Sequence, residues 1–249
     1  MKEVTLQNYN HIFWELATKY DTINDNIIRK IIHSFSVAEK CFSIASSLHL
    51  NKKQRQLCYF VGLFHDIGRF EQWKHYGTYN DKLSENHGFL SAKMVQEIVL
   101  NCDLTKRERE IAIETIKYHN ANYEGADEDV RFYHQILKNG DMFANVITAS
   151  NGIHQISIEK DGVTEPLLND FLNLKKLYKY NQTTKLDRAL MLTALTYYID
   201  FDFLTKEIIE KHYIDSIYET FSVYLNKEDK LIYKNAIETL KKKLDKKNK

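Results

Sequence analysis

The stretch GLFHDIGRFEQ, residues 62–72, places a histidine and an aspartate side by side at the end of a helical pattern. The residues before it recur at the spacing of one apolar helix face, formed by Leu57, Phe60, Val61 and Phe64. That face continues to His65, so its imidazole is expected to project inward, and Gly68 is expected to let the backbone leave the helix. A buried carboxylate at Asp66 is costly unless it is paired or bound to a cation. The stretch is therefore either a solvated helix end or one part of a metal site.

The rest of the chain also favours helices. It contains one proline and eight glycines, so it has few helix breakers. Thr105 is predicted to be the N-cap of a helix over 106–119. In the segment 152–166, alternating residues and Asp161-Gly162 predict a short hairpin or a loop. Apolar periodicity predicts the other helices at about 23–48, 52–66, 85–101, 129–149, 184–202, 204–224 and 228–245. The predicted fold class is all-α.

Composition limits the kinds of partner. Hydrophobic residues make up 43% and charged residues 28% of 249 residues, which is typical of a globular chain. The net charge of +1 gives no global attraction to nucleic acid or anionic membranes, and we expect neither partner. The chain lacks both a signal-peptide pattern and a run of ~20 apolar residues. Cys41, Cys58 and Cys102 are interpreted as reduced thiols, so we expect a cytoplasmic protein; its oligomeric state is left open.

Four more side chains of the metal-binding type lie on or beside inward helix faces: His33, His87, His119 and Asp141. Each belongs to a different helical segment, and helices of a bundle can bring such residues to one centre together with His65 and Asp66. Taken singly, each histidine is more often a hydrogen-bonded core or surface residue. For all six residues to be of that ordinary kind, several inward polar groups would have to be satisfied independently, which favours a metal site.

The ordered set of these six residues resembles the HD-domain superfamily of metal-dependent phosphohydrolases, over about residues 25–150. HDIGR resembles the HDIG signature of that family, with Arg69 where many members carry lysine. The resemblance implies an HD-domain helical bundle. We predict a single domain over 1–249, with the HD core at about 25–150 and a helical C-terminal extension, which carries no assignable motif, at about 165–245.

The resemblance also implies roles for the six residues. His33, His65, Asp66 and Asp141 would bind one metal ion; His87 and His119 would bind a second, with Asp66 bridging the two. Neutral imidazoles and carboxylates suit Mn, Fe, Zn, Co or Ni more than Ca or Mg. We therefore predict two divalent transition-metal ions as cofactors.

The predicted enzyme is a metal-dependent phosphohydrolase. It would hydrolyse a phosphomonoester or phosphodiester, either a nucleotide or a small phosphorylated metabolite, by means of a metal-activated water. Asp66 and Arg69 are assigned catalytic roles, and Arg69, Lys74 and His75 are expected to bind substrate. The alternative for Arg69 is a surface salt bridge with Glu71. Lys74 and His75 are placed in a predicted loop over 71–86.

Two other functions stay open. The same ligands resemble those of the mixed-valent diiron oxygenases of the superfamily, which act on a small polyol or an organophosphonate. A non-catalytic ligand-binding HD protein is the third possibility. Cyclic-dinucleotide phosphodiesterases of the superfamily carry a double histidine and a GYP element, whereas this chain has His119-Asn120 and no GYP, which disfavours that substrate.

Overall fold

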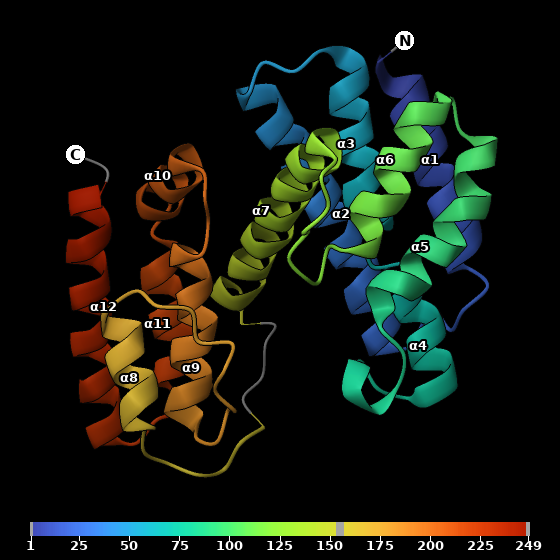
Figure 1. The fold of residues 1–249 in the computed structure, drawn as a ribbon. Helices are drawn as coiled ribbons and strands as arrows, with labels where there is room; N and C mark the ends of the chain where they lie inside the picture. Colours follow the sequence, from blue (N-terminus) through green and yellow to red (C-terminus); the bar gives the residue numbers. More distant parts are fainter. Residues whose placement is uncertain (1, 153–156, 248–249) are drawn as a thin grey trace. The chain divides into compact units, whose positions relative to one another are not determined.

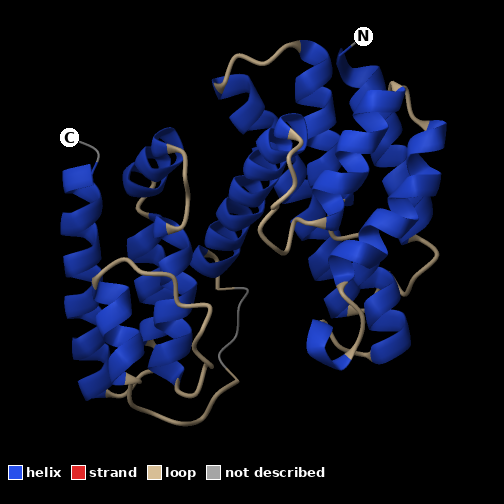
Figure 2. Ribbon diagram, viewed as in Figure 1, coloured by secondary structure: helices blue, strands red, loops and turns tan. Residues whose placement is uncertain are grey.

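The computed structural model describes residues 2–152 and 157–247. Over these residues the chain consists of helices joined by loops, with no strand (Figure 2), which confirms the all-α prediction. The chain divides into two compact units, residues 1–141 and 142–249, and the boundary falls within helix α7 (Glu128–Ser150). The expectation of a single domain with a helical extension stays a prediction.

Unit 1 is a bundle in which helix α3 is central. Helix α3 packs against α1, α2 and α6, while α4 packs against α2 and α5, and α5 against α6 (Figure 1). Two 3₁₀ turns, η1 (Asp81–Leu83) and η2 (Val99–Asn101), lie before and after α5. The helices that precede α7 are α1 (Lys2–Ala17), α2 (Asp25–Ser47), α3 (Lys52–Phe64), α4 (Gly68–Tyr76), α5 (His87–Ile98) and α6 (Lys106–Lys117).

Side-chain caps fix where several of these helices begin. Thr105 accepts a hydrogen bond from the Glu108 amide and Glu108 returns one to the Thr105 amide, a capping box that confirms the predicted start of α6. Asn51 and Gln54 form the same arrangement at α3. The Asn86 side chain accepts hydrogen bonds from the first-turn amides of α5, which places His87 at the first helical position.

The apolar face of α3 carries His65 into the interior. Its predicted members Leu57, Phe60, Val61 and Phe64 are 0–1% exposed. Burial of each such side chain contributes about 1.5–3 kcal/mol to folding. A Cβ added at Gly62 would lie 2.8 Å from the Ala38 Cα, so this glycine lets α2 and α3 approach closely.

Gly68 acts differently from the prediction. Its φ is not positive, so it does not end a helix in the left-handed conformation that glycine often adopts there. Helix α3 already ends at Phe64, and α4 begins at Gly68, so His65 and Asp66 occupy the junction between them. A Cβ at Gly68 would lie 2.5 Å from the Ser91 amide nitrogen. The glycine therefore allows α4 to pack closely against α5.

Unit 2 departs from the predicted helix boundaries. The helix expected over 204–224 is broken at His212, whose φ is +55°, and the 184–202 helix ends early in a 3₁₀ turn. The short helix at 165–172 was not predicted. Residues 157–164 contain no strand, while 153–156, with His154, lie outside the described residues. After α7 the elements are α8 (Glu165–Leu172), α9 (Lys185–Ala194), η3 (Leu195–Tyr197), α10 (Asp202–Glu210), α11 (Tyr213–Ser222) and α12 (Lys227–Lys247).

The core of unit 2 forms where α12 packs against α8, α9 and α11. The Thr193 and Tyr233 hydroxyls are 2.7 Å apart and both buried, which joins α9 to α12. The Asp187 carboxylate accepts hydrogen bonds from the backbone and hydroxyl of Thr164 and from the hydroxyl of Thr183, which ties the start of α8 to α9. None of the six predicted ligands belongs to this unit.

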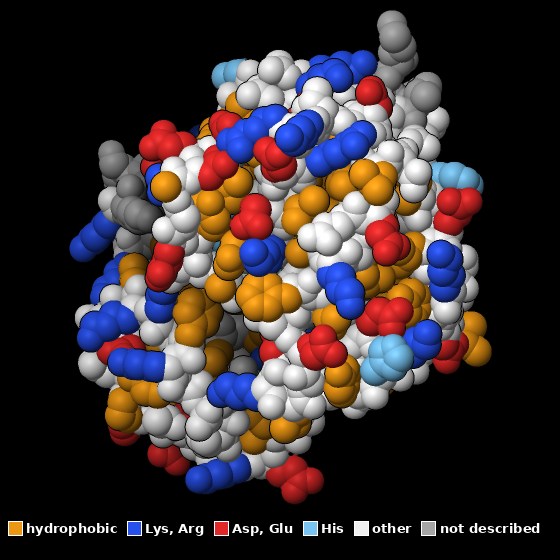
Figure 3. Space-filling view, turned by 45° about the vertical axis from the view of Figure 1, so that its right-hand side comes forward, with side chains coloured by type: hydrophobic (Ala, Val, Ile, Leu, Met, Phe, Trp, Pro, Cys, Tyr) orange, Lys and Arg blue, Asp and Glu red, His pale blue; other side chains and the backbone are white. Residues whose placement is uncertain are grey.

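The surface carries both signs of charge. On the face shown in Figure 3, Lys and Arg side chains are interspersed with Asp and Glu side chains. Among the described helices, none is long and apolar enough to span a membrane.

Candidate metal centre

All six predicted ligands come together in unit 1. His33 lies on α2, His65 and Asp66 at the α3–α4 junction, and His87 at the start of α5. The ring centroids of His33 and His65 are 5.3 Å apart, and those of His65 and His119 are 5.0 Å apart. The prediction that separate helices bring these side chains together is confirmed by this geometry. The roles assigned to them stay predictions.

Asp66 lies at the centre of the cluster. Its Oδ1 atom is 3.5 Å from the His87 Nε2 and 3.3 Å from the His119 Nε2. Its Oδ2 atom is 3.9 Å from the His33 Nε2 and 3.7 Å from the His65 Nε2. Each carboxylate oxygen thus faces a different pair of imidazoles.

Two ligand groups share this carboxylate. His33, His65 and Asp66 form one group with suitable atoms within 4.8 Å of one another, and Asp66, His87 and His119 form the second. The sixth residue adjoins the first group, because Asp141 Oδ1 is 3.0 Å from the His33 Nε2 and 3.9 Å from the His65 Nε2. Such an arrangement suits two ions held by one bridging carboxylate.

Backbone carbonyls fix the tautomer of two histidines. The Nδ1 atom of His65 is 2.8 Å from the Gly62 carbonyl oxygen, and that of His119 is 2.7 Å from the Ile116 carbonyl oxygen. A carbonyl can only accept, so each Nδ1 carries the hydrogen and each Nε2 presents its lone pair to the cluster. This is the tautomer that a metal ligand needs.

His87 is oriented by a carboxylate. Its Nδ1 is 2.7 Å from Asp81 Oδ2 and 2.9 Å from Asp81 Oδ1, so Nδ1 donates and Nε2 again presents a lone pair. A Cβ at Gly88 would lie 2.6 Å from the Lys117 carbonyl oxygen. The absence of a side chain there brings the start of α5 against the end of α6, and hence His87 beside His119.

The cluster leaves buried polar atoms unsatisfied. Within the described residues, His65 Nε2, Asp66 Oδ1 and His119 Nε2 have no hydrogen-bond partner. Buried polar atoms without partners cost free energy, so three at one centre indicate a missing interaction. All three atoms are metal-ligand atoms in the orientation that a cation requires. The residues present therefore fit a divalent transition metal.

Protonation states support the same conclusion. Burial lowers the pKa of His65 to about 3 and that of His87 to about 4, although Asp66 acts in the opposite sense on both. Burial by itself would raise the pKa of Asp66, but Lys30 and His65 outweigh it and hold that pKa well below its usual range. For Asp141, His33 likewise outweighs burial and lowers the pKa. At neutral pH His65 and His87 are therefore neutral, and the carboxyl groups of Asp66 and Asp141 are ionised.

The contacts of Arg69 exclude one of its two alternatives, the salt bridge with Glu71, and its contact with substrate stays a prediction. Glu71 does not pair with Arg69, because the Glu71 carboxylate contacts the Tyr20 hydroxyl and His75 instead. Arg69 is largely buried; its Nη2 lies 3.2 Å from the His87 Nε2 and its Nε 3.6 Å from Asp66 Oδ1. The surface salt bridge predicted as one alternative is therefore wrong, and the guanidinium lies at the cluster.

Three supporting residues were not predicted. Gln72 is fully buried and donates hydrogen bonds to Asp81 Oδ1, the Ser84 hydroxyl and the Glu85 carbonyl. Its side-chain oxygen accepts a hydrogen bond from Arg69. The other two are Asp81, which contacts His87, and Lys30, which contacts Asp66. The Tyr79 carbonyl accepts a hydrogen bond from Arg69.

Asn120 and His134 support the cluster from outside. The Asn120 amide nitrogen is 3.2 Å from Asp81 Oδ2 and 3.1 Å from Asn86 Oδ1. The His134 Nε2 is 3.0 Å from the carbonyl oxygens of Tyr118 and Ala121, on either side of His119. These contacts hold the turn after α6 in place.

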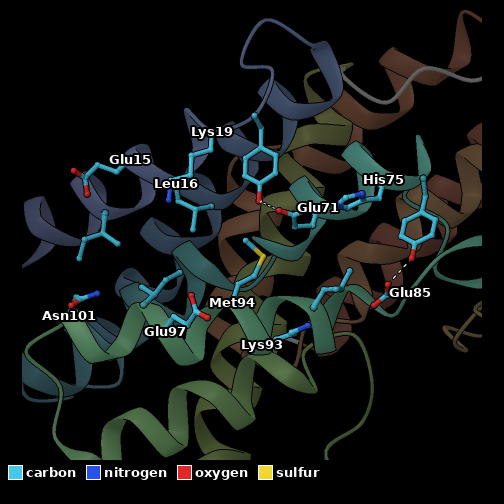
Figure 4. A pocket seen from close by; sticks show the side chains of 15 residues that line it. Glu15, Leu16, Lys19, Glu71, His75, Glu85, Lys93, Met94, Glu97 and Asn101 are labelled. Atoms are coloured by element: carbon cyan, nitrogen blue, oxygen red, sulfur yellow. Dashed lines mark hydrogen bonds and ion pairs between the residues drawn. The ribbon is translucent and has the colours of Figure 1, made fainter.

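Lys74 and His75 lie elsewhere than predicted. Both belong to the last turn of α4 and not to a loop, because that helix continues to Tyr76. Lys74 Nζ lies 5.6 Å from the ring centroid of Tyr20, and His75 pairs with Glu71 at 2.8 Å. His75 and Glu71 line a cavity of about 650 Å³ between α1, α4 and α5 (Figure 4). None of the six cluster residues lines that cavity, and substrate binding by Lys74 and His75 stays a prediction.

The fold and the cluster define an all-α protein with a His/Asp metal-binding centre. A family model described as HD domain matches residues 31–164, more than half of the chain. The chain therefore belongs to the HD-domain family, most of whose members are metal-dependent phosphohydrolases and which binds divalent metals. Comparisons with curated proteins and with solved structures give no match.

Proposed function

We propose that this protein hydrolyses the phosphate ester of a nucleotide or of another small phosphorylated metabolite at a dinuclear centre. The observation that carries the proposal is the pair of ligand groups that share Asp66. Membership of the HD-domain family supports the same reaction class.

The positions of the ligand atoms support an assignment of the residues to two ions. His33, His65 and Asp141 would hold one ion with Asp66 Oδ2, while His87 and His119 would hold the other with Asp66 Oδ1. Two divalent ions, when bound, lower the pKa of a shared water towards neutrality and face the phosphoryl oxygens with positive charge. Because the pKa of His65 is about 3, its imidazole binds without first losing a proton at neutral pH.

Arg69 is placed to contact the phosphoryl group. Its Nη2 hydrogen bonds to the His87 Nε2, and an ion bound at that nitrogen would compete for the same lone pair. The Nη2 donor would then be released at the cluster, and Nε, although 3.6 Å from Asp66 Oδ1, has no hydrogen-bond partner within the described residues. Two adjacent guanidinium donors suit a phosphoryl oxygen pair. Asp81, Gln72 and the Tyr79 carbonyl hold Nη1 and would keep the side chain oriented.

The test is phosphate release from a panel of nucleotides and phosphate esters by Mn²⁺-loaded protein under anaerobic conditions. We expect hydrolysis by the wild type and none above background by Asp66→Asn. Oxygen uptake with a mixed-valent iron EPR signal would instead assign the diiron oxygenase reaction. Well under one equivalent of transition metal after purification without chelator would assign a non-catalytic binding protein.

A further inference from the structure

Three cationic side chains surround the ring of Tyr79. The Arg29 Cζ, the Lys30 Nζ and the Arg69 Cζ lie 5.8, 5.6 and 5.5 Å from the ring centroid. Tyr79 is itself fixed at both ends: its hydroxyl donates to the Asn26 carbonyl at 2.9 Å and its own carbonyl accepts from Arg69 at 2.6 Å. The aromatic ring thus gathers positive charge from α2 and α4 at one place.

Lys30 connects this group to the cluster. Its ammonium nitrogen is 2.5 Å from Asp66 Oδ2, and its side chain retains 18% of its exposure. That oxygen is the one that faces His33 and His65. A divalent ion bound there would attract the carboxylate more strongly than an ammonium does and would repel the ammonium. Lys30 and a metal ion therefore compete for the same atom.

Arg29 uses few of its hydrogen-bond donors within the described residues. It is exposed, and its Nη2 donates to the Asn26 side chain at 3.2 Å. No described carboxylate pairs with it, although it lies over the same aromatic ring as Lys30. An arginine next to a metal cluster without an acidic partner is suited to an anion from outside the chain.

We propose that Arg29 and Lys30 form an anion-binding site at the edge of the cluster, in which Lys30 exchanges Asp66 for a substrate phosphoryl group when a metal ion takes that carboxylate. The proposal deepens the proposed function and rests on it only for the identity of the anion. The anion is the terminal phosphate of a monoester.

The charge balance selects the monoester. Three cations (Arg29, Lys30 and Arg69) accompany three carboxylates (Asp66, Asp81 and Asp141), so the side chains nearly neutralise one another. Each divalent ion would add two positive charges. At neutral pH a phosphomonoester carries close to two negative charges, because its second pKa is about 6, whereas a diester carries one. The dianion offsets the added charge better.

The first experiment measures Mn²⁺ binding by calorimetry on protein freed of metal with a chelator. We expect Lys30→Met to lower the Kd of an ion at least about ten-fold, because the competing cation is gone. Lys53→Met, which removes an exposed lysine in the first turn of α3, should leave the Kd unchanged. Unchanged or weaker Mn²⁺ binding by Lys30→Met would overturn the exchange.

The second experiment measures binding of inorganic phosphate to the Mn²⁺-loaded proteins. Arg29→Met and Lys30→Met should each weaken phosphate binding at least about ten-fold, since each loses a charge-assisted contact. Arg29→Met should not change the Kd for Mn²⁺, and Lys53→Met should change neither. Wild-type phosphate affinity in both variants would overturn the anion site.

Folding of the variants does not limit these tests. Lys30→Met leaves a buried carboxylate without its ammonium, so its folding is checked by circular dichroism and by the rise in Tm with Mn²⁺, which should exceed the wild-type rise. Arg29 is exposed, and Arg29→Met tests the phosphate site independently.

The two proposals fail separately. Phosphate binding needs no turnover, so an inactive protein with normal phosphate binding would refute only hydrolysis. In an active protein, the ratio of kcat/KM for a monoester to that for its methyl diester should fall in both Arg29→Met and Lys30→Met. An unchanged ratio would refute the selection of a dianion.

Discussion

The Nδ1 atom of His87 lies 2.7 Å from Asp81 Oδ2, and this contact decides which nitrogen of the imidazole faces the cluster. The same carboxylate accepts hydrogen bonds from Gln72 and from Arg69. Those contacts hold it in place and, together with His87, lower the pKa of Asp81 although burial acts to raise it. Asp81 therefore couples His87 to α4 without being a ligand itself.

Asp81→Asn tests that coupling. We expect the Kd of the ion held by Asp66, His87 and His119 to rise about 10–100-fold, as is usual when a partner of a ligating histidine is lost. The ion held by His33 and His65 should keep its affinity. Calorimetric titration with Mn²⁺ would resolve the two events, with the exposed Asp103→Asn as the control. Equal weakening of both events would contradict the assignment of Asp81 to one ion.

Asp66→Ala should affect both ions, because its two oxygens face different pairs of histidines. We expect a metal content below one equivalent per protein. Phosphate release should fall more than about 100-fold, which exceeds the loss usual when a residue that only orients a ligand is removed. Metal analysis and steady-state kinetics measure the two quantities. Asp141→Ala is the matched comparison, since that carboxylate lies beside His33 and His65, in the first ligand group, and its loss should spare the second ion.

The residues of the site that could be predicted from sequence lie on or next to helix faces, whereas the role of the others depends on tertiary contacts. The six cluster residues could be found because each follows or continues an apolar helix face, and helix faces converge in a bundle. Asp81 could not, because it lies in a polar loop that resembles any solvated turn. Lys30 and Gln72 could be recognised only weakly, from their spacing. Lys30 lies three residues before His33, and Gln72 lies three residues after Arg69, so each shares a helix face with a site residue.

Some helix boundaries were predicted wrongly for a similar reason. The pattern over 204–224 is continuous, and the break at His212 comes from a positive φ that the local sequence does not require. The packing roles of the glycines could not be predicted from the sequence either. Gly68 resembles a helix terminator in sequence, whereas its role is to admit the backbone of α5, which only the packing shows.

Gly68→Ala should disturb the cluster as well as the fold. The added Cβ would meet the Ser91 amide nitrogen at 2.5 Å and the His87 carbonyl oxygen at 2.8 Å, and backbone atoms cannot move aside cheaply. We expect a loss of about 1–3 kcal/mol in unfolding free energy, the usual cost of overpacking, together with weaker metal binding. Urea denaturation and metal titration measure these effects.

Gly77→Ala provides the control for that variant. No atom of the described residues lies within 4 Å of its added Cβ, and its φ of +61° adds only local strain. Its metal affinity should equal that of the wild type. If Gly68→Ala also kept wild-type metal affinity, α4 and α5 would not need to approach closely for His87 to reach the cluster.

Buried neutral imidazoles should make the chelator-treated protein sensitive to mild acid. Burial, the dominant influence, lowers the pKa of His65 to about 3 and that of His87 to about 4, against an ordinary value of 6.5 that the unfolded chain retains. Between these values the unfolded chain binds more protons, so stability is present above pH 6.5 and is lost as the pH falls towards 4. The depressed pKa values of Asp66 and Asp141 act below pH 3.8, outside this window.

The pH dependence has a definite slope that a single variant can change. Each of the two imidazoles should contribute up to about 1.4 kcal/mol of unfolding free energy per pH unit between pH 6 and 4.5. His87→Gln should reduce the slope by that amount, because glutamine does not titrate, whereas the exposed His11→Gln should not change it. Urea unfolding at half-unit intervals of pH, with chelator present, measures the slope. Equal slopes for His87→Gln and the wild type would show that His87 is already protonated in the folded protein, a state in which its Nε2 could not bind a metal.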